Sequence, residues 1–278
     1  MAWASDSKLA CAVSDAGGLG IISCGGRKSE WVLNEVDNAK RISSQAIGLN
    51  FPLEGMDDKE ADYIIESAFA SDKKTFTVSG SNRYLRLLTK YGDDMLIIPV
   101  IGNVMEAKLA ERTGAKAVIC EGQESGGSIG RLSLFSLLPQ VVDAVEIPVI
   151  AAGGITDGRG LVASLALGAS GVWVGSRFVA SHEWAGPDWA KKALTEVGTD
   201  DTVITKSYDL ATDAPFPFQI GHRVIGNEFT AKWHDNYEEL LQHKEDLKTD
   251  IALAMENADL TVAPVNAGSG SGLSLIHI

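Results

Sequence analysis

Short apolar, β-branched runs alternate with longer amphipathic stretches along most of the chain. Runs that are apolar on both faces are typical of strands covered by helices, whereas apolar residues recurring every three or four positions indicate a helix. The predicted strands are Leu19–Ile22, Ala46–Asn50, Thr75–Val78, Leu96–Ile101, Ala117–Cys120, Pro148–Ala151 and Val172–Gly175. The helices predicted between them are Ser29–Ile42, Asp58–Ala70, Asn82–Tyr91, Val104–Thr113, Leu132–Val145 and Gly158–Leu167. This alternation predicts parallel βαβ units.

Two architectures contain such units, a doubly wound sheet and a (β/α)8 barrel. The doubly wound sheet is disfavoured because Gly17-Gly18-Leu19-Gly20 leads into a strand, whereas its glycine fingerprint follows one. A barrel needs eight strands, one more than we count, and a predicted helix at Lys8–Ala16 precedes the first of them. We therefore expect an α/β fold, a TIM-type (β/α)8 barrel lacking its first strand in this chain, with Met1 an internal methionine of a longer protein.

A long region follows the last predicted strand. It contains a helical pattern at Trp189–Glu196, an irregular stretch at Ala214–Phe218 and an amphipathic helix at Asn236–Asn257. We expect a barrel domain with its C-terminal segment at 1–235, a helical extension at 236–262 and a flexible tail at 263–278, because Gly268–Gly272 has the composition of a linker. The final Leu273–Ile278 back-translates to a sequence resembling a sequencing adapter. We expect an assembly artefact there, with a genuine apolar tail as the alternative.

The charge balance restricts the partners. Of the 278 residues, 24 are Lys or Arg and 37 are Asp or Glu, a formal net charge of −13, which disfavours nucleic-acid binding. No apolar run approaches the length of a membrane span, so we expect no membrane partner. The three cysteines, Cys11, Cys24 and Cys120, are odd in number and lack metal-binding spacing. They indicate reduced thiols, a cytoplasmic location and no metal site.

Glycines at two strand ends indicate a phosphate site. With the missing strand counted as the first, the seventh strand ends at Gly153-Gly154 and the eighth at Gly175-Ser176. Barrel enzymes often bind phosphate in the loops after these two strands, through backbone amides. A single Gly-Gly loop is explained as well by a tight turn, but two such loops on neighbouring strands favour a phosphate cradle.

A long glycine-rich loop, Glu121–Gly130, follows the sixth strand beside this cradle, and loops of this length at the catalytic face are often functional. Asn50 ends the second predicted strand counted in this chain and is expected at the same mouth. Cys120 is expected in the core. His222, His234 and His243 are expected to be surface or packing residues.

Several ordered motifs between Met1 and about Trp233 together resemble the nitronate monooxygenase family, which includes flavin-dependent enoyl-acyl-carrier-protein reductases. They are Met1-Ala2-Trp3, Ala16–Ile22, Gly48–Asn50, Glu121–Gly130, Ala151–Ile155, Gly175–Phe178, Asp201–Thr205 and Arg223–Phe229. The resemblance implies an FMN-binding barrel in which the flavin phosphate contacts Gly153, Gly154, Gly175 and Ser176. It also implies that Asn50, Glu121 and Gly126 contact the flavin and that Met1 lies next to its ring.

One family position differs. The family loop normally ends in Gly-Gly-His, whereas here Gly126-Gly127 precedes Ser128, which therefore stands at the family's catalytic position. A serine hydroxyl without an activating partner is a poor general base near neutral pH. The resemblance thus implies an FMN-dependent enzyme that oxidises alkyl nitronates with O2.

Two alternatives remain open. One is an NAD(P)H-dependent flavin reductase acting on enoyl-thioesters or quinones, and the other is a non-catalytic flavin-binding protein. The expected partners are a small-molecule substrate and O2, and a homodimer is left open.

Overall fold

The seven predicted strands form one parallel sheet in the computed structural model, which describes residues 5–53, 56–71, 74–80, 83–198, 200–213 and 221–275. The strands are paired in the order β1 (Gly20–Ser23), β2 (Ile47–Pro52), β3 (Thr75–Ser79), β4 (Leu96–Ile101), β5 (Val118–Glu121), β7 (Val149–Ala152) and β8 (Gly171–Trp173). Within the described ranges, no strand pairs with the outer edge of β1 or of β8. The expected α/β fold, a TIM-type barrel with seven of its eight strands, is confirmed.

The strands are apolar on both faces because each face packs against a different layer. On β4, Ile97 and Ile101 belong to the large core that the surrounding helices cover. Ile98 and Val100 point the other way and pack with Ile119 in a second cluster. Side chains alternate along a strand, so the second cluster is the inner layer of the curled sheet. The ends of the strands beyond this layer are where a site can open.

The helices that follow the strands begin at polar caps. They are α2 (Ser29–Ile42), α3 (Asp58–Ala70), α4 (Tyr84–Tyr91), α5 (Val104–Arg112), α6 (Leu134–Val142) and α7 (Gly158–Ala166). The side chains of Asp57, Asn103 and Asp157 accept hydrogen bonds from free backbone N–H groups at the starts of α3, α5 and α7. α1 (Ser7–Asp15) precedes β1 and is held to α2 by a hydrogen bond of 2.8 Å from the Ser7 amide to Glu35 Oε2.

A second, antiparallel sheet was not predicted. Its central strand β10 (His222–Ile225) pairs with β9 (Thr202–Thr205) on one side and with the two-residue β6 (Gly127–Ser128) on the other. The glycine-rich loop after β5 is thereby joined to a part of the chain almost 100 residues further on. This sheet fixes one wall of the barrel mouth.

The region beyond β8 is otherwise helical. Its helices are α8 (Ser176–Val179), α9 (Asp188–Glu196), α10 (Ser207–Thr212), α11 (Glu228–Trp233), α12 (Tyr237–Gln242) and α13 (Lys244–Asn257). The single helix expected at Asn236–Asn257 is wrong, because the chain turns at His243 between α12 and α13. The turn lets Leu240 and Leu247 pack in one cluster with Trp233. The irregular stretch at Ala214–Phe218 lies outside the described residues.

The segment 263–275, expected to be a flexible tail, lies against the rest of the molecule. Val265 and Ala267 are buried with residues of α1 and α9, and the Ile225 amide donates to the Val265 carbonyl at 2.9 Å. The Ser269 amide donates to the Glu124 carbonyl at 3.0 Å, and Ser271–Leu275 forms a 3-10 turn, η1. The proposed domain boundaries themselves stay a prediction. Residues 276–278 of the supposed artefact lie outside the described chain.

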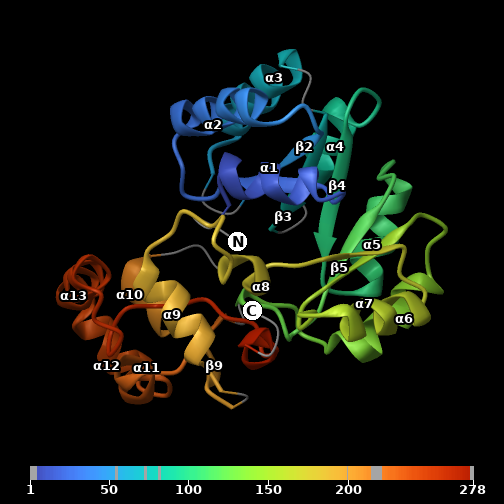
Figure 1. Cartoon of the computed structure of the whole chain (residues 1–278). Helices are drawn as coiled ribbons and strands as arrows, with labels where there is room; N and C mark the ends of the chain where they lie inside the picture. The colour runs from blue at the N-terminus through green and yellow to red at the C-terminus, as the bar shows by residue number, and fades with distance from the viewer. Residues whose placement is uncertain are drawn as a thin grey trace.

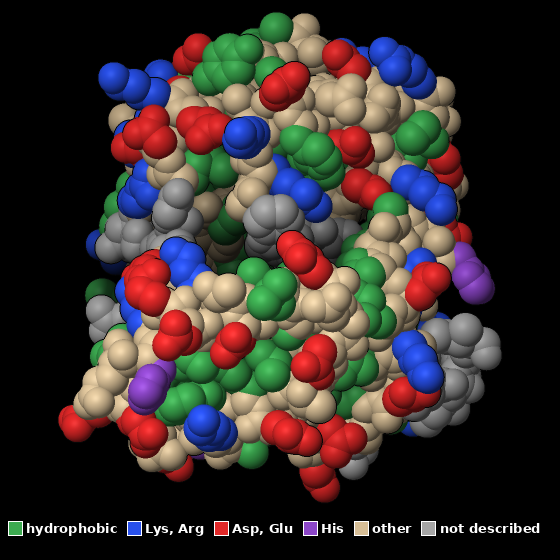
Figure 2. All heavy atoms as spheres, turned by 90° about the vertical axis from the view of Figure 1, so that its left-hand side faces the viewer, with side chains coloured by type: hydrophobic (Ala, Val, Ile, Leu, Met, Phe, Trp, Pro, Cys, Tyr) green, Lys and Arg blue, Asp and Glu red, His purple; other side chains and the backbone are tan. Residues whose placement is uncertain are grey.

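Helices α10–α13 form a group at the lower left of Figure 1, separate from helices α2–α7 around the sheet. Figure 2 shows acidic and basic side chains interspersed over one face, with carboxylates prominent in its lower half, in keeping with the net charge of −13. None of the helices in the described chain is long and apolar enough to cross a bilayer.

Candidate functional site

A cavity of about 410 Å³ opens where the strands of the parallel sheet end. This volume lies within the usual range for cofactor and small-molecule sites. Its walls are supplied by α1, by β1 and the end of β2, by the loops after β5, β7 and β8, and by β10 and the segment near residue 268. It brings together every described residue proposed for the site, namely Asn50, Glu121, Gly126, Ser128, Gly153, Gly154, Gly175 and Ser176. Met1 lies outside the described residues.

The two strand-end loops form a cradle of backbone and small side chains. Gly153 and Gly154 have φ values of +104° and +70°, a left-handed conformation that side chains disfavour. A Cβ atom on Gly154 would lie 2.9 Å from Glu124 Cβ, so the loop also lacks room for a larger residue. Within the described chain, nothing accepts a hydrogen bond from the amide of either glycine. Free amides that face a cavity can bind phosphate oxygens.

Ser176 stands opposite, at the start of α8. Its Oγ accepts a hydrogen bond of 3.0 Å from the Gly268 amide, which leaves the hydroxyl proton free to donate to a ligand. The segment at Ala267 and Gly268 also lies close to the loop after β5. This approach requires a glycine at position 126, because a Cβ there would lie 2.6 Å from the Ala267 carbonyl carbon. Residues 267–271 are therefore a third side of the cradle. Sequence reasoning missed them because their composition is that of a linker.

Asn50 is fixed in the wall of the cavity. It is buried, and its side-chain amide donates to Thr77 Oγ1 on the neighbouring strand at 2.9 Å. The pairing of β2 with β3 places Asn50 directly beside Thr77. Its orientation is thus set by the sheet itself. Cys120, one residue before the end of β5, is fully buried, and burial raises the pKa of its thiol to about 12, as suits a core residue.

Glu121 is the ionisable carboxyl that β5 brings to the cavity. Burial raises its pKa to about 7, because the ionised form loses water that the surroundings do not replace, and this outweighs its hydrogen bond with Ser125. Glu124, on the same loop, is structural, since its carboxylate accepts the Leu134 amide at 2.9 Å and caps α6. Near neutral pH, Glu121 can therefore either donate a proton or carry a charge.

We expect the Glu121→Gln substitution to alter the pH dependence of stability. The Glu121 carboxyl has a pKa of about 7 in the folded chain and an ordinary value of 4.5. Its contribution to the unfolding free energy is therefore fully present below pH 4.5 and is lost as the pH rises to 7. Relative to wild type, the variant should gain up to about 3 kcal/mol in unfolding free energy between about pH 4.5 and pH 8. Urea unfolding of the flavin-free chain measures the difference. Glu196→Gln, an exposed position on α9, is the control, and parallel pH profiles for all three proteins would contradict the assignment.

A histidine that sequence reasoning expected to be a surface or packing residue lines this cavity instead. His222 Nε2 lies 3.0 Å from Ser128 Oγ, and His222 Nδ1 lies 2.5 Å from Asp209 Oδ1. Ser128 and His222 are direct partners across the pairing of β6 with β10, which sets their side chains on one face of the small sheet. The expectation for His222 is corrected. The pairing is long-range, so no local pattern signals it.

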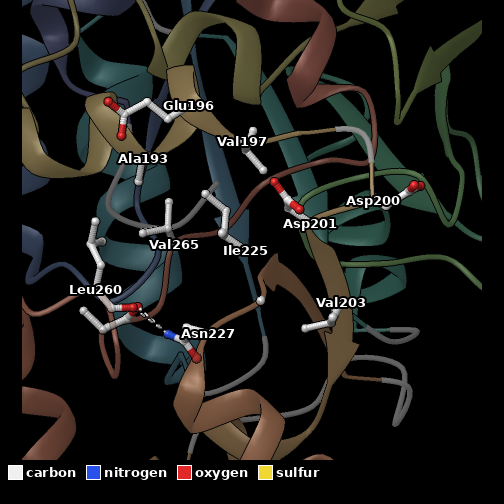
Figure 3. Close-up of a pocket in the computed structure, with 12 residues that line it drawn as sticks. Ala193, Glu196, Val197, Asp200, Asp201, Val203, Ile225, Asn227, Leu260 and Val265 are labelled. Carbon is white, nitrogen blue, oxygen red and sulfur yellow. Dashed lines mark hydrogen bonds between the residues drawn. The ribbon is translucent and has the colours of Figure 1, made fainter.

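A second cavity, of about 440 Å³, lies between α9 and the antiparallel sheet (Figure 3). Apart from Asn227, its walls are apolar or acidic, and no described residue lining it is a histidine, cysteine, serine, lysine or arginine. Two of its polar groups serve the fold, because Asp201 accepts the Gly198 amide at 2.6 Å, and Asn227 caps α11 and donates to the Leu260 carbonyl. The cavity at the barrel mouth is therefore the better candidate for chemistry.

Comparison with known proteins gives a consistent set of relatives. The sequence model described as nitronate monooxygenase matches residues 75–271. Two curated relatives are 5-hydroxy-7a-methyl-1-oxo-octahydro-1H-indene-4-carboxyl-CoA dehydrogenases. The one from Rhodococcus jostii is 34% identical over 75% of this chain and 58% of its own length, and the one from Mycobacterium tuberculosis is 32% identical over 84% and 63%. The chain thus spans about three-fifths of these relatives.

A probable nitronate monooxygenase of Staphylococcus aureus is 29% identical over 75% of this chain and 71% of its own length. Among solved structures, FabK from Thermotoga maritima superposes with a TM-score of 0.85 at 34% identity and covers 98% of this chain and 84% of its own. A nitroalkane oxidase from Streptomyces ansochromogenes, at 24% identity and a TM-score of 0.82 over 98% and 88% of the two chains, shares the fold. The family match extends to residue 271 and so includes the third side of the cradle.

Proposed function

This chain belongs to the nitronate monooxygenase family, and on that premise we propose that it is an FMN-dependent oxidoreductase of the nitronate monooxygenase type. The observation that carries the proposal is the cradle at the barrel mouth. Two glycines with positive φ, a serine hydroxyl and the segment 267–271 converge there on one cavity. Their small size and free amides fit a phosphate-bearing cofactor.

The residues divide into two groups along the cavity. Gly153, Gly154, Gly175 and Ser176 would hold the FMN phosphate, while Asn50, Glu121, Gly126 and Ser128, which line the same cavity, would contact the rest of the flavin or the substrate. FMN, when bound, would accept an electron pair from the substrate and pass it to oxygen. The protein supplies binding, orientation and a largely apolar setting in which charged and polar groups act strongly.

We propose alkyl nitronates as the substrates. A nitronate is already an anion, so its oxidation requires no base on the protein, which suits a loop carrying Ser128 at the family's histidine position. Glu121 supports the choice, because a carboxyl with a pKa of about 7 can be neutral at physiological pH and donate a hydrogen bond to an anion.

Acyl-thioester chemistry is a second candidate. It is favoured by the two relatives at 34% and 32% identity, whose names specify a carboxyl-CoA substrate. An NAD(P)H-dependent reduction of an enoyl-thioester would use the same cradle and the same strand-end residues. The two candidates differ in the compound that reduces the flavin.

Anaerobic mixing distinguishes them. The flavin-loaded chain is mixed separately with propionate 3-nitronate, NADH and NADPH, while the absorbance of the oxidised flavin is followed. We expect the nitronate to bleach the flavin within one turnover and oxygen to restore the colour. Bleaching only by NADH or NADPH would favour the thioester reductase. A bound yellow flavin that none of the three bleaches would contradict both and leave a non-catalytic flavin protein.

A further inference from the structure

Three side chains from three separate elements meet beside the cavity. Ser128 lies on β6, His222 on β10 and Asp209 in the first turn of α10. Ser128 Oγ lies 3.0 Å from His222 Nε2, and the other ring nitrogen, Nδ1, lies 2.5 Å from Asp209 Oδ1. Ser128 and His222 both line the cavity, whereas Asp209 lies behind them and is only 3% exposed. The order of hydroxyl, imidazole and buried carboxylate is that of a proton-transfer triad.

The surroundings of Asp209 add an independent observation. Its second carboxylate oxygen, Oδ2, is buried and has no hydrogen-bond partner within the described chain. His222 Nδ1 is likewise buried without an aligned hydrogen-bond partner, so its 2.5 Å approach to Asp209 Oδ1 is a close contact that a small rotation of the ring or the carboxylate would turn into a hydrogen bond. A buried carboxylate oxygen without a partner is costly, which favours such an alignment. The neighbouring Arg223 is engaged elsewhere, because its guanidinium donates to the Gln123 carbonyl at 3.2 Å and to Thr202 Oγ1 at 3.1 Å. The imidazole of His222 is therefore the basic side chain that approaches Asp209, at 2.5 Å.

We propose that Ser128, His222 and Asp209 together remove a proton from carbon, so that the site accepts neutral nitroalkanes in addition to their anions. This inference rests on the proposed function and extends its substrate class. A histidine from the C-terminal region would thus provide, through Ser128, the base that the loop after β5 lacks. The same array would serve any substrate with an acidic C–H bond.

The step balances without an oxidant. The proton leaves the α-carbon of the nitroalkane for Ser128 Oγ as the Ser128 hydroxyl proton passes to His222 Nε2. The electron pair of the broken C–H bond stays on the substrate and makes it a nitronate, and the imidazolium formed is stabilised by Asp209. Oxidation of that nitronate is then the reaction proposed above. Asp209 acts through His222 and is a positioning residue, because a proton on Nδ1 directed at Asp209 Oδ1 would leave Nε2 free to accept the Ser128 proton.

Comparing a neutral nitroalkane with its own nitronate tests the proposed role of Ser128, His222 and Asp209, because only the nitroalkane must lose a proton from carbon. We expect His222→Gln to lower kcat/KM for a neutral nitroalkane about 100-fold more than it lowers kcat/KM for the matching nitronate, because about 100-fold is the usual scale of general-base catalysis and only the nitroalkane needs the base. Asp209→Asn should act in the same direction. The kinetic isotope effect of α-deuterated nitroalkane should rise in both variants. His234→Gln, at an exposed histidine of the same region, should change neither substrate's turnover.

The protonation of the two His222 ring nitrogens can also be measured by NMR, without flavin or substrate. In the ¹⁵N spectrum of histidine-labelled chain at about pH 8, the His222 signals, assigned by their loss in His222→Gln, should show a protonated Nδ1 and an unprotonated, hydrogen-bonded Nε2. Ser128→Ala should shift the Nε2 signal. A protonated Nε2 would overturn the proposal.

The activity measurements distinguish failure of the Ser128, His222 and Asp209 array from failure of the proposed function. Turnover of the nitronate without turnover of the nitroalkane by wild type would overturn the array, as would an equal loss of both activities in His222→Gln. If wild type turns over neither substrate, the proposed function fails, and the ¹⁵N spectrum alone then decides whether the array exists.

Discussion

Replacing Gly20 by alanine is expected to destabilise the folded chain by about 3 kcal/mol or more, the upper range for overpacked sites. A Cβ atom on Gly20 would lie 1.8 Å from the Ala10 carbonyl oxygen and 2.5 Å from its carbon. Both are backbone atoms of α1, so no rotation of a side chain relieves the clash. α1 cannot move away freely, because Ser14 Oγ accepts the Gly20 amide at 2.9 Å and donates to the Ala46 carbonyl at 2.7 Å.

Urea unfolding measures this effect, with Gly158→Ala as the matched control. Gly158 begins α7, and nothing lies within 4 Å of a Cβ placed there. Alanine favours a helix by up to about 1 kcal/mol over glycine, so the control should unfold at the same urea concentration as wild type or at a higher one. If Gly20→Ala also unfolds at the wild-type concentration, α1 does not pack on β1 as the structure shows.

Local patterns predicted the barrel elements well. The bounds of α2, α3 and β4 agree with the expected ranges, and the other strands of the parallel sheet shift by one or two residues at an end. These elements have a strong local signal, since a strand such as Leu96–Ile101 is apolar throughout and Asp58–Ala70 follows a capping aspartate. Their order along the chain is also their order in the sheet, so neighbours in sequence are neighbours in space.

The antiparallel sheet has no comparable signal. β6 is only two residues long, and its partner β10 is a short strand that begins with His222 and Arg223. Such segments become strands because they pair with each other across a long sequence separation. The role of His222 was missed for the same reason, since the residue that gives it chemical meaning, Ser128, lies 94 positions away.

Composition misled the interpretation of the segment 268–272. Glycine and serine in alternation are typical of flexible linkers, yet the same small residues are needed where two backbones approach closely. A Cβ on Gly270 would lie 2.9 Å from the Gly154 carbonyl oxygen, and one on Gly268 would lie 2.9 Å from the Glu124 carbonyl oxygen. The glycines fit this segment against the cradle, a reason visible only when the neighbouring loop is in place.

The second large expected effect is that of the Gly154→Val substitution in the cradle on cofactor binding. Valine at position 154 would require a β-branched residue at a φ of +70°, with its Cβ 2.9 Å from that of Glu124. The loop can escape a strain of about 1–3 kcal/mol only by changing conformation, which turns its amides away from the cavity. Gly171→Ala is the control, because Gly171 begins β8 on the neighbouring strand and nothing lies within 4 Å of a Cβ placed there.

We expect Gly154→Val to weaken FMN binding by about 100-fold, a loss of about 3 kcal/mol, while Gly171→Ala binds as wild type does. Fluorescence titration of the flavin-free chain with FMN and with riboflavin measures this, and urea unfolding verifies that each variant is folded. Wild type should prefer FMN, because only FMN carries the phosphate. In Gly154→Val the preference for FMN over riboflavin should shrink by about the same 100-fold, since the lost amides are among those proposed to hold the phosphate. An equal weakening of both flavins would mean that this loop shapes the cavity without holding a phosphate.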